Sequence, residues 1–420
     1  MKKESSIKRT VLDNGVVVIS ENLPGYESAA VGLYIKSGSR HEGEKHNGLA
    51  HFFEHIVFKG TERRSALELA ASVEEKGGQF NAYTSTDHTC FFAHTAASEL
   101  MTAVDTICEM INSPKIDPVG VKNEKEVILE EVRANMDHPD RVANELYMKA
   151  LWGWTELGRP VAGTVASVKR LGVKDLEEYH TKVLYESPMV VVASGKDVNH
   201  SELVKAVRKG LSRKTGIGCV HEGITPFFKS VSETKHMAVN QACVRTGTLI
   251  PTNDDRLLFT YPIVRHIMGG GMTSRLFRVV REEMGLVYGI WANLDPYVEG
   301  VGFTVGYKAE PKKAAKAFEA IRDEIASMKR IGFSKDDIRK AKDALRGQAS
   351  LSYESALERM MLLGERELDG KKMIEISAMI RRTESITAKD VDEAIEMISG
   401  VDEWAYGAVV PNGWRGKIRK

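Results

Sequence analysis

The chain has 420 residues, with 59 lysines and arginines against 58 aspartates and glutamates, and 42% of its residues are hydrophobic. This length predicts two or three domains of roughly 100–200 residues each, and the apolar content excludes a disordered protein. The formal net charge of +1 provides no overall attraction to nucleic acid or to an anionic membrane, so we expect neither as a partner.

The cysteines and the N-terminus bear on the compartment. Cys90, Cys108, Cys219 and Cys243 lie far apart and form no Cys-x-x-Cys pair. This spacing disfavours a disulfide scaffold and a cysteine-ligated zinc site, and it fits a reducing compartment. No apolar signal segment follows the basic N-terminal residues, and the longest apolar runs are far shorter than the ~20 residues of a membrane helix. We therefore expect a soluble, cytoplasmic protein.

Strand-like and helical stretches alternate through the first half of the chain, which is typical of mixed α and β structure. Hydrophobic periodicity and glycine positions predict the following elements. The predicted strands are residues 16–21, 29–37, 80–95 and 189–194, and the predicted helices are residues 47–58, 66–76, 98–112 and 117–135.

The middle of the chain contains a candidate linker. Residues 208–226 are rich in Gly, Lys, Arg and Ser and have little periodicity. The strand-like residues 241–251 and the helical residues 256–269 that follow parallel the strand and the helix before Gly60. We predict an α+β fold of two similar domains, with residues 1–210 as the first domain, 211–226 as the linker and 227–420 as the second domain.

The sharpest feature is the H-x-x-E-H string formed by His51, Phe52, Phe53, Glu54 and His55. On a helix, His55 lies about 40° from His51, and Glu54 lies about 60° away on the other side. Two histidines at this spacing can bind one metal ion, with the glutamate placed to take a proton from a water molecule. The alternative is an amphipathic helix that has these polar residues on its solvated side.

A catalytic zinc site needs a third protein ligand, and the helix predicted at 117–135 offers one. Glu124 and Glu131 are seven residues apart and share a face with apolar residues, whereas Glu126 and Glu130 project to the other side. A carboxylate on an apolar face needs a cation or a hydrogen-bond partner. This geometry favours Glu131 over Glu130 but does not choose between Glu131 and Glu124. A long helix with ordinary surface charges is the alternative.

Two segments together resemble a known family. Residues 48–61 and 124–131 are similar to the zinc-site segments of the pitrilysin-like zinc peptidases, in the branch that contains the β-type mitochondrial processing peptidase and short bacterial relatives. The resemblance implies that His51, His55 and Glu131 bind one Zn²⁺ per chain and that Glu54 is the general base. It also implies that Glu124 is a supporting carboxylate with a catalytic role.

The resemblance extends to substrate contacts. Residues 80–92 are similar to the edge strand of the family, which implies that Asn81 and Ala82 contact an extended peptide. Taken alone, Asn81 fits a turn residue equally well. Arg281 and Tyr288 match the pair seven residues apart in the family's C-terminal domain, and they are implied to bind the substrate backbone and stabilise the oxyanion. Without the resemblance, Arg281 is a surface charge and Tyr288 a core-edge aromatic.

The function implied by the resemblance is a zinc-dependent endopeptidase that hydrolyses extended or unfolded peptides in a closed chamber. Each domain would form one clamshell half, from a mainly antiparallel sheet packed with helices. Because the chain is short for the family and carries each motif once, we expect a homodimer. Two alternatives stay open: a presequence-processing peptidase with a dedicated partner, and a non-catalytic scaffold of the core-protein type, against which the intact zinc motif argues.

Overall fold

The computed structural model describes residues 6–211, 232–250, 255–401 and 404–418. The linker predicted at 211–226 lies outside these ranges except for its first residue. The described chain forms two compact units, each with one β-sheet. Within the described ranges, the first unit draws on residues 6–133, 160–211 and 350–374, and the second on residues 134–159, 232–349 and 375–418.

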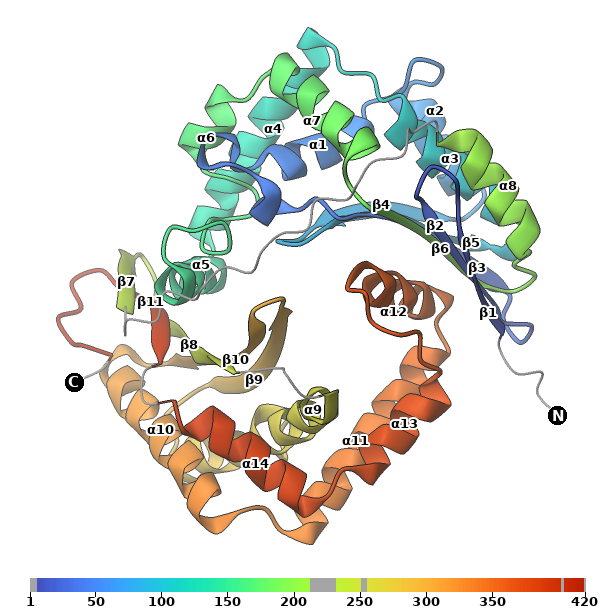
Figure 1. Ribbon diagram of the computed structural model, residues 1–420. Coiled ribbons are helices and arrows are strands. Elements are labelled where there is room, and N and C mark those ends of the chain that lie inside the picture. Colours follow the sequence, from blue (N-terminus) through green and yellow to red (C-terminus); the bar gives the residue numbers. More distant parts are fainter. Residues whose placement is uncertain (1–5, 212–231, 251–254, 402–403, 419–420) are drawn as a thin grey trace. The chain divides into compact units, whose positions relative to one another are not determined.

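The first unit is built on a six-stranded sheet (Figure 1). Its strands are β1 (Ser6–Val11), β2 (Val17–Asn22), β3 (Ser28–Ile35), β4 (Gln79–Thr84), β5 (Thr89–Ala96) and β6 (Met189–Gly195). Their spatial order is β1-β2-β6-β3-β5-β4, and β4 is an edge strand. The pair β2–β6 is parallel and all the other neighbours are antiparallel.

Helices from the first half of the chain cover one face of this sheet, where their apolar residues share a core with Val31, Leu33 and Phe91. These helices are α1 (Leu49–Val57), α2 (Ala66–Glu74), α3 (Leu100–Asn112), α4 (Pro118–Asp137), α6 (Val165–Arg170), α7 (Val173–Tyr185) and α8 (His200–Gly210). Short 3₁₀ turns lie at Ser39–His41, Glu44–His46 and Ala97–Glu99. Helix α12 (Ala356–Leu368) packs against β3 and β6 on the opposite face.

The second unit contains a five-stranded sheet with the order β7-β11-β8-β10-β9. Its strands are β7 (Ser232–Met237), β8 (Ala242–Ile250), β9 (Gly289–Tyr297), β10 (Gly300–Ala309) and β11 (Ala405–Pro411). The associated helices are α5 (Pro139–Trp152), α9 (Asp255–Gly269), α10 (Ala314–Ile331), α11 (Lys335–Tyr353), α13 (Ile376–Ser385) and α14 (Ala388–Ser399), with a π-helix at Phe277–Glu283 and a 3₁₀ turn at Pro311–Lys313. Within the described residues, no helix is both long and apolar enough to cross a membrane.

The two sheets repeat one topology. Strands β2-β6-β3-β5-β4 of the first sheet correspond in order to β7-β11-β8-β10-β9 of the second, and both sheets have one parallel pair, β2–β6 and β7–β11. In the chain, β3 leads to α1 as β8 leads to α9, and the hairpin β4–β5 corresponds to β9–β10. The predicted α+β fold with two similar domains is therefore confirmed.

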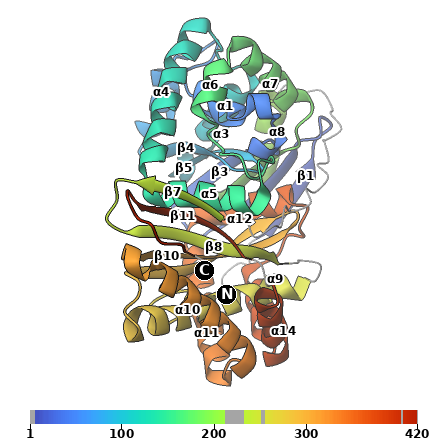
Figure 2. The same ribbon diagram turned by 90° about the vertical axis from the view of Figure 1, so that its left-hand side faces the viewer.

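The repeats exchange one helix each, which the sequence patterns did not indicate. Helix α12 follows α11 in the second half of the chain but packs on the first sheet, and α5 follows α4 in the first half but packs on the second sheet (Figures 1 and 2). Both contacts are close because glycine lies at the interface. A Cβ on Gly364 would lie 2.1 Å from the Tyr34 ring, and one on Gly407 would lie 2.1 Å from the backbone nitrogen of Tyr147.

One predicted element is wrong in detail. Residues 80–95, expected as a single strand, form the hairpin of β4 and β5. The turn between them is closed by a hydrogen bond of 2.8 Å from the Ser85 N–H to the His88 carbonyl. The Ser85 hydroxyl also accepts hydrogen bonds from the backbone N–H groups of Asp87 and His88. Side chains of this kind compete with strand pairing through local hydrogen bonds, and this favours a turn.

A buried ion pair fixes α12 on the first sheet. The Arg359 guanidinium on α12 donates two hydrogen bonds to the Glu21 carboxylate on β2, one of them 2.9 Å long from Nε to Oε2. The Ser194 hydroxyl donates a third, at 3.1 Å. Arg359 is 1% and Glu21 0% exposed, so neither charge has solvent to replace its partner.

We expect Arg359→Met to destabilise the first unit by about 3–5 kcal/mol, because it leaves the Glu21 carboxylate buried without a cation. Urea-induced unfolding measures the loss. Arg9→Met is the matched control, since it removes a partly exposed ion pair of 2.8 Å with Glu367 on the same helix. That variant should lose less than about 1 kcal/mol. Equal losses from the two variants would contradict a special role for the buried pair.

Candidate metal centre

Helix α1 carries the H-x-x-E-H string and is held at its N-terminus by an upstream carboxylate. Its N-cap, Gly48, has φ = 97° and offers no side chain to the first-turn N–H groups. The buried Glu42 carboxylate accepts hydrogen bonds from the N–H of Gly48 (2.7 Å) and of Ala50 (2.5 Å), and from the Asn47 side-chain amide (3.4 Å). A negative charge is favourable at this end of a helix. Glu42 thereby fixes the first turn, in which His51 lies.

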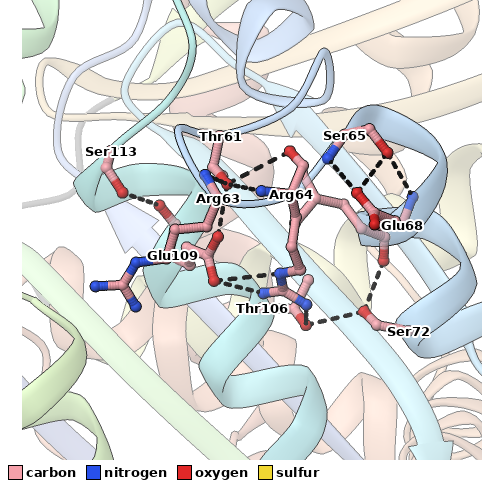
Figure 3. Close-up of polar contacts among 10 residues, drawn as sticks. Thr61, Arg63, Arg64, Ser65, Glu68, Ser72, Thr106, Glu109 and Ser113 are labelled. Atoms are coloured by element: carbon pink, nitrogen blue, oxygen red, sulfur yellow. Dashed lines mark hydrogen bonds and ion pairs between the residues drawn. The ribbon is translucent and has the colours of Figure 1, made fainter.

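The segment after α1 is held by a polar network (Figure 3). The Arg64 guanidinium contacts the Glu109 carboxylate on α3 at 2.9 Å and 3.2 Å, and it also donates to Thr106. The Thr61 hydroxyl donates to the other oxygen of Glu109 and accepts the Arg64 N–H. These contacts fasten the connection between α1 and α2 to α3, so both ends of α1 are fixed.

Two imidazoles and one carboxylate meet beside α1. His51, His55 and Glu131 each offer a donor atom, and the three atoms lie within 4.8 Å of one another. Oε2 of Glu131 lies 3.7 Å from His51 Nε2 and 3.5 Å from His55 Nε2. The structure therefore brings together the three residues that the resemblance implied as zinc ligands, from α1 and α4.

This group fits a zinc ion. Tetrahedral zinc sites use imidazole nitrogen and carboxylate oxygen at roughly 2.0–2.2 Å, which places neighbouring ligand atoms roughly 3.3–3.6 Å apart. The two distances at Glu131 are close to this range. Three protein ligands would leave a fourth position for water or substrate, as in catalytic zinc sites.

The histidines have opposite proton affinities. Burial and the neighbouring His55 together lower the pKa of His51 to about 4, although Glu131 acts to raise it. Burial also disfavours charge on His55, but hydrogen bonds to Glu124 and Glu131 outweigh it and raise the pKa of His55 to about 9. At neutral pH without a metal, these shifts favour a neutral His51 and a protonated His55, whose additional proton lies between two carboxylates. Metal ligation requires neutral imidazoles, so a bound cation would replace this proton.

Glu124 occupies a different position from Glu131. It is 4% exposed, and its Oε1 accepts a hydrogen bond of 2.8 Å from His55 Nδ1, on the far side of the ring from Nε2. Its Oε2 lies 2.6 Å from the Lys59 ammonium. Burial acts to raise the pKa of Glu124, but the contacts with His55 and Lys59 outweigh it and lower this pKa. The two glutamates therefore differ in position: Glu131 faces both Nε2 atoms, whereas Glu124 contacts Nδ1 of His55.

Glu54 lies next to His55 with its carboxylate turned to the edge strand. The Thr84 hydroxyl, at the end of β4, donates a short hydrogen bond to Glu54 Oε2. Burial raises the pKa of Glu54, while the Thr84 hydrogen bond and His55 oppose this rise.

Asn81 and Ala82 lie on β4, whose partner in the described sheet is β5 alone. The Asn81 carboxamide oxygen accepts a hydrogen bond of 2.8 Å from the Ala82 N–H, and the Asn81 side chain is otherwise exposed. Their contact with a peptide stays a prediction.

Arg281 and Tyr288 belong to the second unit, and their place at the metal group also stays a prediction. Arg281 lies on the π-helix, with its guanidinium 4.4 Å from the ring centre of Phe277 and 5.9 Å from that of Tyr288. Tyr288 is 72% exposed. The pair is therefore close together and accessible within its own unit.

Sequence reasoning missed Glu42, Lys59 and Thr84. Lys59 follows His51 and His55 at the same four-residue interval, so helical spacing could have indicated it. Glu42 and Thr84 reach α1 through contacts that span loops and strands, and no periodicity points to them.

We expect Glu42→Gln to destabilise the protein by about 1–3 kcal/mol. The substitution replaces one acceptor oxygen by an NH₂ group, so one backbone N–H of α1 would face a second donor and lose its hydrogen bond. Thermal unfolding measures the change. Glu44→Gln, two residues away and exposed, is the control and should be nearly neutral. An unchanged melting temperature for Glu42→Gln would show that its carboxylate does not support α1.

Comparison with known proteins identifies the family of this chain. Residues 17–165 match the family model described as insulinase (peptidase family M16), and residues 170–345 match that described as the peptidase M16 inactive domain. An uncharacterized zinc protease of Mycobacterium tuberculosis is 32% identical over 97% of this chain and 93% of its own length. Another, from Bacillus subtilis, is 29% identical over 97% of this chain and 99% of its own.

The fold also matches solved structures. A crystal structure from Pseudomonas fluorescens, titled as a peptidase M16 inactive domain, aligns with a TM-score of 0.88 at 18% identity over 98% of this chain and 100% of that chain. Family models match both halves of the chain, and relatives above 30% identity cover nearly its whole length. The chain therefore belongs to peptidase family M16.

Proposed function

We propose that this protein is a zinc-dependent endopeptidase that hydrolyses extended or unfolded peptides. The observation that carries the proposal is the convergence of His51, His55 and Glu131 beside the carboxylate of Glu54. Zinc-protease relatives and family membership support it. A zinc ion, when bound, supplies a Lewis acid that activates water and polarises a carbonyl.

The residues of the chain have separate roles in this proposal. His51, His55 and Glu131 hold one Zn²⁺ per chain, and Glu124 orients His55 through Nδ1. Lys59 holds Glu124 through the opposite oxygen. Glu54 takes the proton from the attacking water and returns it to the leaving amine.

Substrate binding is assigned to two places. The free edge of β4 pairs with the extended peptide, with Asn81 and Ala82 in contact with it. Arg281 and Tyr288 donate hydrogen bonds to the peptide backbone and to the oxyanion. The closed chamber and the cytoplasmic compartment belong to the proposal as well.

Replacing Glu54 by Gln should reduce hydrolysis of a quenched-fluorescent unfolded peptide by about 10²–10⁴-fold, because the proton acceptor is lost. Metal analysis should find zinc retained, since Glu54 lies outside the His51–His55–Glu131 group. Glu131→Gln should lose zinc, and Glu130→Gln is its matched control, because Glu130 is exposed and instead contacts Arg133.

Two outcomes would count against the proposal. A Glu54→Gln variant with full zinc and full activity would remove Glu54 as the base. Wild-type protein without zinc and without chelator-sensitive hydrolysis would favour a scaffold of the core-protein type. Cleavage-site mapping on presequence peptides separates a general oligopeptidase from a processing peptidase.

We further propose that the active species is a homodimer in which one chain supplies the zinc group and the other supplies Arg281 and Tyr288. The chain contains each set once, and the second half matches a model described as an inactive domain. Sedimentation velocity should find the peptidase activity in a dimer.

Mixing two inactive variants tests the shared site directly. After subunit exchange, Glu54→Gln and Arg281→Ala chains should recover about one quarter of the wild-type activity, because half of the dimers are mixed and each has one intact site. Each variant incubated alone is the control. An active monomer, or no recovery on mixing, would contradict the dimer.

A further inference from the structure

The contact between Thr84 and Glu54 joins two elements that the proposed function treats separately. Glu54 lies on α1 next to His55, and Thr84 is the last residue of the edge strand β4. The Thr84 hydroxyl donates a hydrogen bond to Glu54 Oε2. A carboxylate accepts at two oxygens, so this bond engages one and leaves Oε1 to accept a proton.

The hydroxyl of Thr84 is itself held in place. Thr84 is paired with Thr89 in the β4–β5 hairpin, and their hydroxyl oxygens are 3.4 Å apart. The buried Thr89 hydroxyl donates to the Ser37 carbonyl at 3.0 Å. The Tyr179 hydroxyl on α7 also donates to Ser37, at 2.9 Å from its Oγ. Because the Thr84 proton faces Glu54 and the Thr89 proton faces Ser37, the 3.4 Å approach of the two hydroxyl oxygens is a packing contact. The bonds of Thr89 and Tyr179 to Ser37 hold Thr89, and with it the paired Thr84, against the interior of the first unit.

One short segment ties down both sides of the contact. The backbone N–H groups of Ser39 and Arg40 bond to the carbonyls of Ser85 and Thr86, at 3.1 Å and 2.9 Å, directly after Thr84. The Arg40 guanidinium adds an ion pair of 2.7 Å with Asp87. The same segment continues to Glu42, which holds the N-terminus of α1. The positions of Thr84 and of the Glu54 backbone are thus fixed by residues 39–42.

We propose that Thr84 is a positioning residue for Glu54: it orients the carboxylate and aligns it with the strand that receives the peptide. The inference rests on the proposed function. A general base must lie within hydrogen-bond reach of the proton that it removes. A glutamate side chain has several rotamers, and the Thr84 hydroxyl selects one of them. Because Thr84 ends β4, its contact with Glu54 fixes the position of the base relative to a peptide bound to this strand.

The test compares Thr84→Val with Thr84→Ser. Valine keeps the shape but removes the donor, so kcat should fall about 10–100-fold with KM nearly unchanged. Serine retains the hydroxyl and should restore kcat to within about threefold of wild type. Zinc content should be the same in all three proteins. Thr95→Val is the matched control, since Thr95 is a buried threonine on the adjacent β5 whose hydroxyl has no hydrogen-bond partner among the described residues.

A readout besides activity is the crystal structure of zinc-free Thr84→Val. The Glu54 carboxylate should leave its wild-type position or occupy several. An unmoved carboxylate, wild-type kcat in Thr84→Val, an equal defect in Thr84→Ser, or an effect on KM alone would each overturn the inference. If wild-type protein lacks chelator-sensitive hydrolysis, the proposed function fails. The position of the Glu54 carboxylate in the Thr84→Val crystal structure still decides whether Thr84 orients it.

Discussion

Three carboxylates lie around the two imidazoles at α1. Their negative charges need compensating cations, and this is the constraint on which the site depends. Glu124 is buried between His55 and Lys59, and Glu131 faces both Nε2 atoms. Removal of the Glu124 carboxylate from water, with further carboxylates close by, is costly unless cations compensate the negative charges. Lys59 supplies one charge and the His55 proton another, and a bound zinc ion would take over the second role. The centre is therefore built for a cation before any substrate arrives.

The rigidity of this centre comes from outside α1. The helix is short and lacks a side-chain cap of its own, so Glu42 holds its start and the Arg64–Glu109 network holds the segment after its end. The same upstream segment contacts the β4–β5 turn. Helix and edge strand are thus fixed by shared contacts, and a metal site on rigid elements keeps its geometry more accurately than one on loops.

The two units share one topology but differ in the side chains that they carry. Both sheets repeat one strand order, and each receives a helix from the other half of the chain. The exchange makes the folding of each unit dependent on both halves, because α12 is joined to β2 by the buried Arg359–Glu21 pair. The candidate metal group belongs to the first unit, with His51 and His55 on α1 and Glu131 on α4. The counterpart of α1 in the second unit, α9, lacks the H-x-x-E-H string. This agrees with the family model that matches the second half, which is described as an inactive domain.

Local patterns in the sequence determined the helices and strands of the first half, the repeat of the second, and the residues with metal-binding chemistry, because helical and strand periodicity place neighbouring residues on one face. The hairpin at 80–95 was missed, because local turn bonds at Ser85 overrode a continuous β pattern. Tertiary structure alone placed Glu131 opposite both Nε2 atoms and Glu124 at Nδ1 of His55, brought Glu42, Lys59 and Thr84 to α1, and exchanged α5 with α12. These contacts join residues far apart in the chain, so their geometry arises only when the sheet and its helices pack together.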